Sequence, residues 1–229
     1  MRFIVTLILG TFLAVSASAS ERPVVVELYT SQGCSSCPPA DALLGELAKD
    51  PDVIALAFHV DYWDYIGWPD PFAERAYTQR QRGYARAQGE RTVYTPQMIM
   101  DGRSHVVGNN TTAVRNAINE YKEMASVMAL NAENSNGRVT VFAPEKRLSA
   151  KADVLLIEYM PSATTEVLRG ENAGRKLTYH NIVRSVQKLG TWSSSGAKIL
   201  KGRQKFDLPA VILVQEVGHG PILAATQFK

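Results

Sequence analysis

Two short apolar runs, joined by a helical segment, constrain the fold of this chain most strongly. Residues 23–29 (PVVVELY) and 53–60 (VIALAFHV) are nearly continuous in hydrophobicity, as strands buried on both faces of a sheet are. Between them, four apolar residues recur at helical spacing: Ala40, Leu43, Leu44 and Leu47. A strand, a helix and a second strand in this order predict a βαβ unit, which means a parallel strand pair with a right-handed crossover.

The rest of the chain divides into a mixed part and a strand-rich part. A polar, arginine-rich helix is expected over residues 72–88, and a strand over 92–103 turns at Asp101-Gly102 into a short partner strand. A further helix is expected over 112–129, capped by Thr111 or Thr112. Beyond it the expected strands cover residues 138–143, 152–160, 166–170, 175–190, 209–217 and 221–228. Frequent turn signals with no helical pattern between them are typical of an antiparallel sandwich.

Both cysteines of the chain lie between the first strand and the helix, in the motif Cys34-Ser-Ser-Cys37. A disulfide that closes so short a loop contributes roughly 2 kcal/mol, and a domain of this size has enough core to fold without it. A redox pair or a metal site is therefore favoured over a structural disulfide. Cys34 is expected at the helix N-terminus, where free N–H groups and the helix dipole stabilise a thiolate, and Cys37 is expected to resolve a mixed disulfide. Pro38 and Pro39 cannot donate backbone hydrogen bonds, so they fix the helix start at the cysteines.

A cysteine pair in this position resembles the thioredoxin fold family, and the resemblance covers residues 22–125. It implies that Thr95-Pro96 is a cis-prolyl pair that lies beside Cys34 and presents an extended substrate segment. It also implies a buried acid that relays a proton to Cys37, a role that Glu27 could fill. Trp63, in an inserted aromatic stretch at residues 61–71, is expected to line the substrate groove.

Longer runs are similar to a family of secreted bacterial thioredoxin-like proteins that is catalogued only as a domain of unknown function. These runs are ELYTSQGCSSCPPAD, HVDYWD, GWPDP, YTPQ, ENAGR and HNIVR. The expected fold class is an α/β thioredoxin-like domain followed by an all-β sandwich-like domain, at residues 20–130 and 131–229. The sequence departs from thioredoxin at Gly33, where a tryptophan is usual, and in the Ser-Ser dipeptide between the cysteines.

Residues 1–19 are expected to be a signal peptide. Arg2 precedes an apolar run from Phe3 to Val15, and Ala17-Ser18-Ala19 fits a cleavage site. The run is shorter than the roughly 20 residues of a membrane-spanning helix, so we expect a periplasmic or secreted protein with no stable membrane anchor after cleavage. The formal net charge of +3 provides no electrostatic footprint for nucleic acid.

The function that the sequence favours is thiol–disulfide exchange with the thiols or disulfides of partner proteins, without a cofactor or a bound metal. Two alternatives remain open. A copper-binding chaperone would use Cys34, Cys37 and His59, because His59 follows the second strand and is expected at the same sheet edge as the cysteines. A binding module would contain an inert disulfide. The sequence indicates neither the direction of the redox reaction nor an oligomeric state.

Overall fold

The computed structural model describes residues 23–124, 130–145, 148–193 and 196–228. The expected signal peptide at residues 1–19 lies outside the described residues. Within them, no helix is long and apolar enough to cross a membrane.

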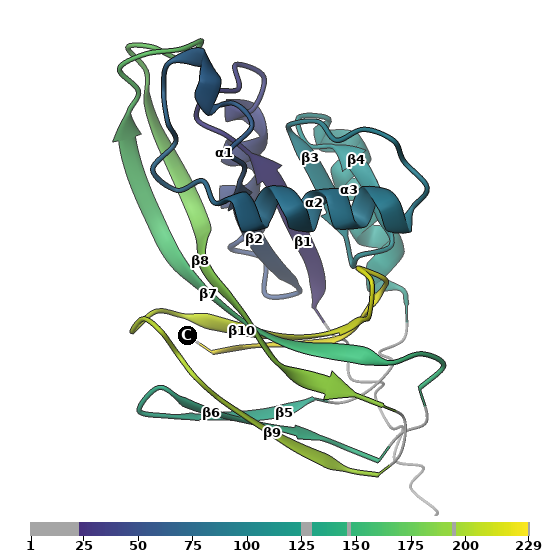
Figure 1. Ribbon diagram of the computed structural model, residues 1–229. Coiled ribbons are helices and arrows are strands. Elements are labelled where there is room, and N and C mark those ends of the chain that lie inside the picture. The colour runs from purple at the N-terminus through teal and green to yellow at the C-terminus, as the bar shows by residue number, and fades with distance from the viewer. Residues whose placement is uncertain (1–22, 125–129, 146–147, 194–195, 229) are drawn as a thin grey trace, which may run out of the picture.

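The described residues form two sheets and three α-helices (Figure 1). The larger sheet has eight strands in the order β11-β10-β7-β8-β2-β1-β3-β4. Its strands are β1 (Val24–Thr30), β2 (Val53–His59), β3 (Gln97–Met100), β4 (Ser104–Val107), β7 (Ala152–Glu166), β8 (Lys176–Trp192), β10 (Ala210–Glu216) and β11 (Ile222–Phe228). The smaller sheet contains β5 (Asn131–Ser135), β6 (Arg138–Ala143) and β9 (Lys198–Arg203). The helices are α1 (Pro38–Leu47), α2 (Arg75–Ala87), α3 (Thr111–Lys122) and the short 3-10 helix η1 (Asp64–Ile66).

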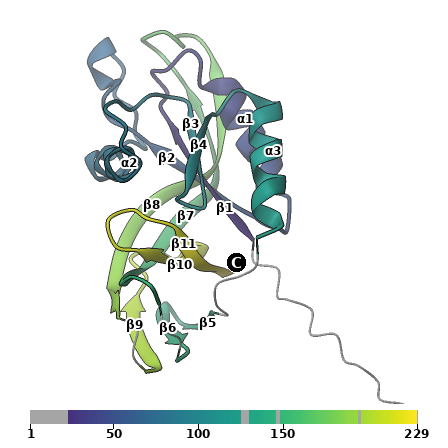
Figure 2. The same ribbon diagram turned by 90° about the vertical axis from the view of Figure 1, so that its right-hand side faces the viewer.

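The predicted βαβ unit is confirmed, because β1 and β2 pair in parallel from Val24↔Val53 to Thr30↔His59 and α1 connects them. Every residue of both strands is buried. Figure 2 shows why: α1 and α3 cover one face of these strands and α2 covers the other. Strands covered on both faces lack the alternation of apolar and polar residues, which explains their continuous hydrophobicity.

The strand-rich second part of the chain is present, but it shares a sheet with the first part. β8 pairs in parallel with β2 at Ala57↔Ile182, and the Asn181 side chain donates to the carbonyl oxygen of Ala55 at 2.9 Å. The smaller sheet packs on the far face of β7, β10 and β11 around a cluster that includes Trp192. The smaller sheet therefore packs on one end of a large sheet that continues into β1 and β2, so the fold is mixed α/β with one large, mostly antiparallel sheet.

Several expected boundaries are corrected. α3 begins at Thr111 and is capped by Asn110, whose side chain accepts from the N–H of Ala113 at 3.1 Å, instead of by a threonine. α3 ends at Lys122, and residues 125–129 of the expected helix lie outside the described residues. Strands β5 and β9 were not predicted, because their residues are mostly exposed and polar.

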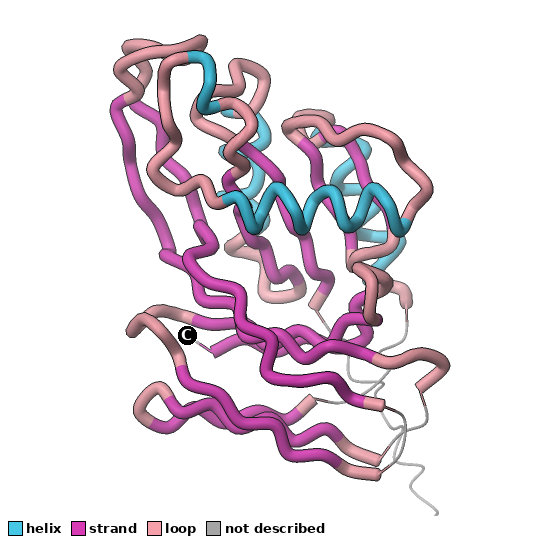
Figure 3. The backbone as a smooth tube through the Cα atoms, in the orientation of Figure 1, coloured by secondary structure: helices cyan, strands magenta, loops and turns pink. Residues whose placement is uncertain are grey.

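The strand expected at residues 166–170 is instead the end of a long hairpin. β7 and β8 form this hairpin, and residues 167–175, here called the hairpin tip, connect them. The hairpin rises beside α1 in the tube view (Figure 3). A Cβ atom on Gly170 in the tip would lie 3.3 Å from Ile66 of η1, so the tip packs on the segment that follows β2.

Candidate functional site

Cys34 and Cys37 are joined by a disulfide, with their Cα atoms 5.4 Å apart. The pair lies after β1, and α1 begins at Pro38 with Cys37 as its N-cap residue. Pro38 and Pro39 occupy the first helical positions, where an amide N–H would have no acceptor within the helix. The prolines therefore fix the helix start as predicted. Cys34 lies one turn before that start, since the N–H of Cys37 donates to its carbonyl at 3.2 Å.

The disulfide lies directly beneath the surface. Cys34 is 1% exposed and Cys37 is fully buried, whereas Ser35 and Ser36 between them are exposed. The Ser36 hydroxyl lies 3.4 Å from the Cys34 sulfur. A partner that reaches the pair would therefore first meet the two serines.

The inserted segment at residues 61–71 packs on the loop before Cys34. A Cβ atom on Gly33 would lie 3.1 Å from the side chains of both Trp63 and Ile66. Glycine at this position therefore allows the segment to approach the backbone closely. This contact accounts for the absence of the tryptophan that the resemblance would place there.

Thr95 and Pro96 lie between this segment and the first turn of α1. The indole N–H of Trp63 donates to the Thr95 hydroxyl at 2.8 Å, and the Thr95-Pro96 peptide bond is cis. A Cβ atom on Gly108 would lie 3.2 Å from both Pro96 and Ala40, so the proline is close to α1. The structure thus brings together Trp63, Thr95 and Pro96, which the sequence assigned to substrate binding.

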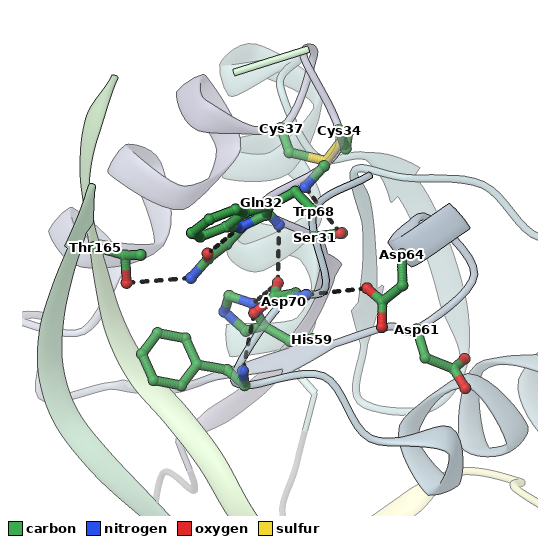
Figure 4. Close-up of polar contacts among 12 residues, drawn as sticks. Ser31, Gln32, Cys34, Cys37, His59, Asp61, Asp64, Trp68, Asp70 and Thr165 are labelled. Carbon is green, nitrogen blue, oxygen red and sulfur yellow. Dashed lines mark hydrogen bonds and ion pairs between the residues drawn. A yellow bond between two sulfur atoms is a disulfide. The ribbon is translucent and has the colours of Figure 1, made fainter. Parts of the chain in front are cut away.

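Gln32 anchors the loop that leads to the cysteines (Figure 4). Its backbone N–H donates to Asp70 Oδ2 at 2.8 Å, and its side-chain oxygen accepts from the indole of Trp68 at 2.9 Å. Its side-chain amide donates to the Thr165 hydroxyl of β7 at 3.2 Å. This buried residue is therefore held both by the inserted segment and by the hairpin.

The hairpin tip makes three further contacts with the cysteine loop. The side-chain amide of Asn172 donates to the carbonyl oxygens of Gln32 and Cys34, each at 2.9 Å. The carboxylate of Glu171 accepts from the N–H of Ser35 at 3.2 Å. Asn172 is 1% exposed, so its hydrogen bonds are closed to water. The second part of the chain, to which the sequence assigned no chemistry, thus forms one wall of the site.

His59 lies at the end of β2 and binds Asp70, with 2.6 Å between Nδ1 and Oδ2. Burial raises the pKa of Asp70, but the charge of His59 and hydrogen bonds from His59, Gln32 and Phe72 outweigh burial and hold this pKa below its usual range. Asp61, two residues after His59, accepts from the Thr78 hydroxyl and so contacts α2. His59 is a buried, paired histidine.

A second buried carboxyl, Asp41, lies one helical turn after Cys37 on α1. Asp41 is 4% exposed, and its N–H donates to the Cys37 carbonyl at 3.1 Å. Side chains four residues apart on a helix are neighbours, so Asp41 lies on the same side of α1 as Cys37. Burial raises the pKa of Asp41 to about 7, although the charge of His59 and the Thr30 hydroxyl oppose the rise.

Asp41 belongs to a cluster of polar groups beneath α1. Among the residues that the structure describes, no atom pairs at hydrogen-bonding geometry with the Asp41 carboxyl, the Thr30 hydroxyl, His59 Nε2 or the Tyr179 hydroxyl. Thr30 and His59 are opposite each other in β1 and β2, and the rings of His59 and Tyr179 are 5.0 Å apart. The region beneath the first turn of α1 is therefore polar and closed to solvent.

Glu27 lies on the other face of the sheet. Its neighbours Val25 and Tyr29 pack in the core beneath α2, and its carboxylate accepts from Arg80 Nη2 at 2.6 Å and from Nε at 2.8 Å. The hydroxyls of Tyr29 and Tyr84 also donate to it, each at 2.9 Å. The prediction that Glu27 relays a proton to Cys37 is wrong, because the carboxylate is turned away from α1 and paired with Arg80.

The residues proposed for copper do not form a ligand set. The cysteines are joined to each other, His59 is paired with Asp70, and the described residues contain no group of three or more potential metal ligands.

Sequence reasoning missed four residues at the site: Asp41, Asp70, Glu171 and Asn172. Asp41 had a local signal, since it follows Cys37 by one turn in a helix whose other inward positions are apolar. Asp70 and the pair Glu171-Asn172 fall in the runs GWPDP and ENAGR, which carried the family resemblance without any assigned role.

A family model described as "Protein of unknown function (DUF1223)" matches residues 25–216, and the chain belongs to this family. The expectation of a family of unknown function is confirmed. No curated protein matches the chain.

Two solved structures are similar to this protein. The crystal structure of a protein from Agrobacterium tumefaciens is 32% identical, with a TM-score of 0.78, and the match covers 92% of this chain and 96% of that chain. HBP35 of Porphyromonas gingivalis is 14% identical, with a TM-score of 0.60, and the match covers 91% of this chain and 75% of that chain. At the latter identity the likeness concerns the fold alone.

Proposed function

We propose that this member of the DUF1223 family is a thiol–disulfide oxidoreductase that acts on partner proteins in the periplasm or outside the cell. The observation that carries the proposal is the Cys34–Cys37 disulfide between β1 and the start of α1. A thiol that lies just before the start of a helix is at the positive end of the helix dipole, which favours the thiolate, the reactive form.

The order β1-α1-β2-α2-β3-β4-α3 supports a thioredoxin-like first part of the chain. In the proposal, the strands that follow form a sandwich-like second part, and its hairpin completes the site. Thr95, Pro96 and Trp63 lie together beside the cysteine loop and would bind an extended segment of the partner.

The exchange has two steps. The Cys34 thiolate attacks a partner disulfide, forms a mixed disulfide and releases one partner thiolate. The sulfur of Cys37, after loss of its proton, attacks Cys34, forms the Cys34–Cys37 disulfide and releases the second partner thiolate. Two electrons pass from the cysteine pair to the partner, and the reverse sequence oxidises a partner dithiol.

The second step requires that the buried Cys37 thiol lose a proton. Asp41 is the acid that supports this step, because it lies one turn from Cys37 on the same helix and is excluded from water. A carboxyl whose pKa is about 7 is poised to accept and return a proton near neutral pH. Asp41 thus takes the role that the sequence gave to Glu27.

Single-cysteine variants test the proposal against a defined probe, a peptide that contains one disulfide. The Cys37→Ser variant is expected to accumulate a mixed disulfide with the peptide through Cys34, observed by mass spectrometry and released by reductant. The Cys34→Ser variant is the matched control and should form far less adduct, because in the proposal Cys34 is the attacking thiol and Cys37 only resolves the mixed disulfide. Equal reactivity of the two variants, or a disulfide that no glutathione ratio reduces in the folded protein, would contradict the proposal.

A further inference from the structure

Two neighbouring side chains of the hairpin tip hold three backbone groups of the cysteine loop. Asn172 donates to the carbonyls of Gln32 and Cys34, and Glu171 accepts from the N–H of Ser35. These residues are separated by 136 to 140 positions in the sequence. The loop that carries Cys34 is therefore fixed from outside its own βαβ unit.

Asn172 is itself held in place. Its side-chain oxygen accepts from Arg175 Nη1 at 2.8 Å, while both donations of its amide are to the loop. Removal of a buried donor leaves the carbonyls that it served unsatisfied, and this cost is largest when the loop cannot move to find water. The disulfide holds the loop closed, so the oxidised form depends more on Asn172 than the reduced form does.

Glu171 acts through its charge. Its carboxylate accepts the hydrogen bond from the N–H of Ser35, the residue that directly follows Cys34. This N–H is therefore not available to donate to a Cys34 thiolate and stabilise it. Hydrogen bonds from the Ser35 hydroxyl and N–H lower the pKa of Glu171, so this carboxylate is charged at neutral pH. A negative charge beside a thiol opposes its ionisation.

We propose that Asn172 and Glu171 are positioning residues that shift the Cys34–Cys37 couple toward the disulfide, Asn172 by holding the closed loop and Glu171 by opposing the Cys34 thiolate. The proposal deepens the thiol–disulfide function proposed above and rests on it. The reaction concerned is the exchange of the protein disulfide with two glutathione thiols, which gives the protein dithiol and one glutathione disulfide with transfer of two electrons.

The variants Glu171→Gln and Asn172→Ala should both make the couple more oxidising. A single surface charge shifts a nearby thiol pKa by a fraction of a unit to about one unit, so we expect Glu171→Gln to change the equilibrium constant with glutathione by about two- to tenfold. A tenfold change corresponds to about 30 mV. The same variant should lower the pKa of the Cys34 thiol, measured by thiolate absorbance. High salt should remove most of its effect and little of the effect of Asn172→Ala.

Glu166→Gln is the matched control, because Glu166 is an exposed carboxylate at the end of β7, just before the tip. It should leave both the equilibrium constant and the thiol pKa unchanged. The proposal is overturned if Glu171→Gln does not differ from this control, or if it shifts the couple toward the disulfide. Because Glu171 is exposed, its variant gives this answer even where Asn172→Ala fails to fold.

The two proposals fail in different ways. If the glutathione equilibrium shifts as expected but no peptide disulfide reacts with Cys34, the positioning role stands and the exchange function falls. If the peptide reacts but the variants match the control, the exchange function stands and the positioning role falls.

Discussion

Replacing Asp41 with asparagine tests whether the carboxyl beneath the first turn of α1 is held neutral by burial. Asp41 is 4% exposed, and among the described residues neither of its carboxyl oxygens pairs at hydrogen-bonding geometry. Asparagine has nearly the same shape and no charge. The substitution therefore removes the ionisation of this group and leaves its packing in place.

The size of the effect follows from the two pKa values of the group. Burial raises the pKa of Asp41 from 3.8 to about 7 in the folded protein. Between these values the unfolded chain loses the proton while the folded chain keeps it, so the free energy of unfolding falls as pH rises. At about 1.4 kcal/mol per pKa unit, the loss is complete above pH 7 and amounts to roughly 4 kcal/mol. Asp41→Asn should remove this loss, and should have little effect on stability below pH 4.

Urea unfolding of the oxidised protein at several values between pH 4 and pH 8 measures the difference directly. The difference in stability between the variant and the original protein should grow with pH in favour of Asp41→Asn and become level above pH 7. The exposed residue Asp207 supplies the control, and Asp207→Asn should give a difference that does not depend on pH. A difference for Asp41→Asn that is the same at all pH values would refute the argument that burial keeps this carboxyl protonated.

Three further outcomes are expected, each measured by chemical denaturation. Arg80→Met should destabilise the protein by about 3–5 kcal/mol because it leaves the buried Glu27 carboxylate without its cation, and Glu27→Gln in the same chain should restore part of the loss. Gly102→Ala should destabilise the protein by about 1–3 kcal/mol, because Gly102 has a φ of 68° and a Cβ atom there would lie 2.6 Å from the backbone carbonyl oxygen of Gly220. Gly174→Ala is the control and should cost less, because Gly174 has a similar φ of 78° but a Cβ atom there would meet no atom within 4 Å. The fragment 23–124 should show no cooperative unfolding, since it lacks the strands that pair with β2 and cover the α2 face of the sheet, and a sigmoidal transition would contradict this expectation.

The parts of the fold that the sequence predicted are those with local signals. The runs of β1 and β2, the helical spacing of α1 and the two prolines each act within a few residues, and the structure follows them. The face of the sheet on which Glu27 lies could not be predicted from such local signals. A strand buried on both faces has no polar alternation to show which way a side chain points, and a shift of one residue moves it to the opposite face. The assignment of Glu27 to the Cys37 side was therefore unsupported by any pattern.

The residues that the hairpin tip contributes to the site, Glu171 and Asn172, could not be predicted, because their position depends on a pairing between strands that are distant in the sequence. The hairpin tip reaches Cys34 because β8 joins β2 at Ala57↔Ile182, in the middle of the larger sheet. That pairing joins strands separated by more than a hundred residues, and hydrophobic periodicity carries no information about which strands become neighbours. A change from strand to turn near residue 166 was also hidden, because β-branched and apolar residues continue across it.

Three buried acids differ in the groups that lie against their carboxyls. Glu27 is paired with Arg80 on the α2 side of the sheet, and Asp70 is bound to His59 and accepts backbone N–H donors that stabilise its charge. At Asp41 burial is the largest effect and outweighs the charge of His59 and the Thr30 hydroxyl, so the pKa of this carboxyl is raised. It is also the acid on the helix of Cys37. A pH dependence of the second exchange step that disappears in Asp41→Asn would therefore connect the stability of this helix with the chemistry at its start.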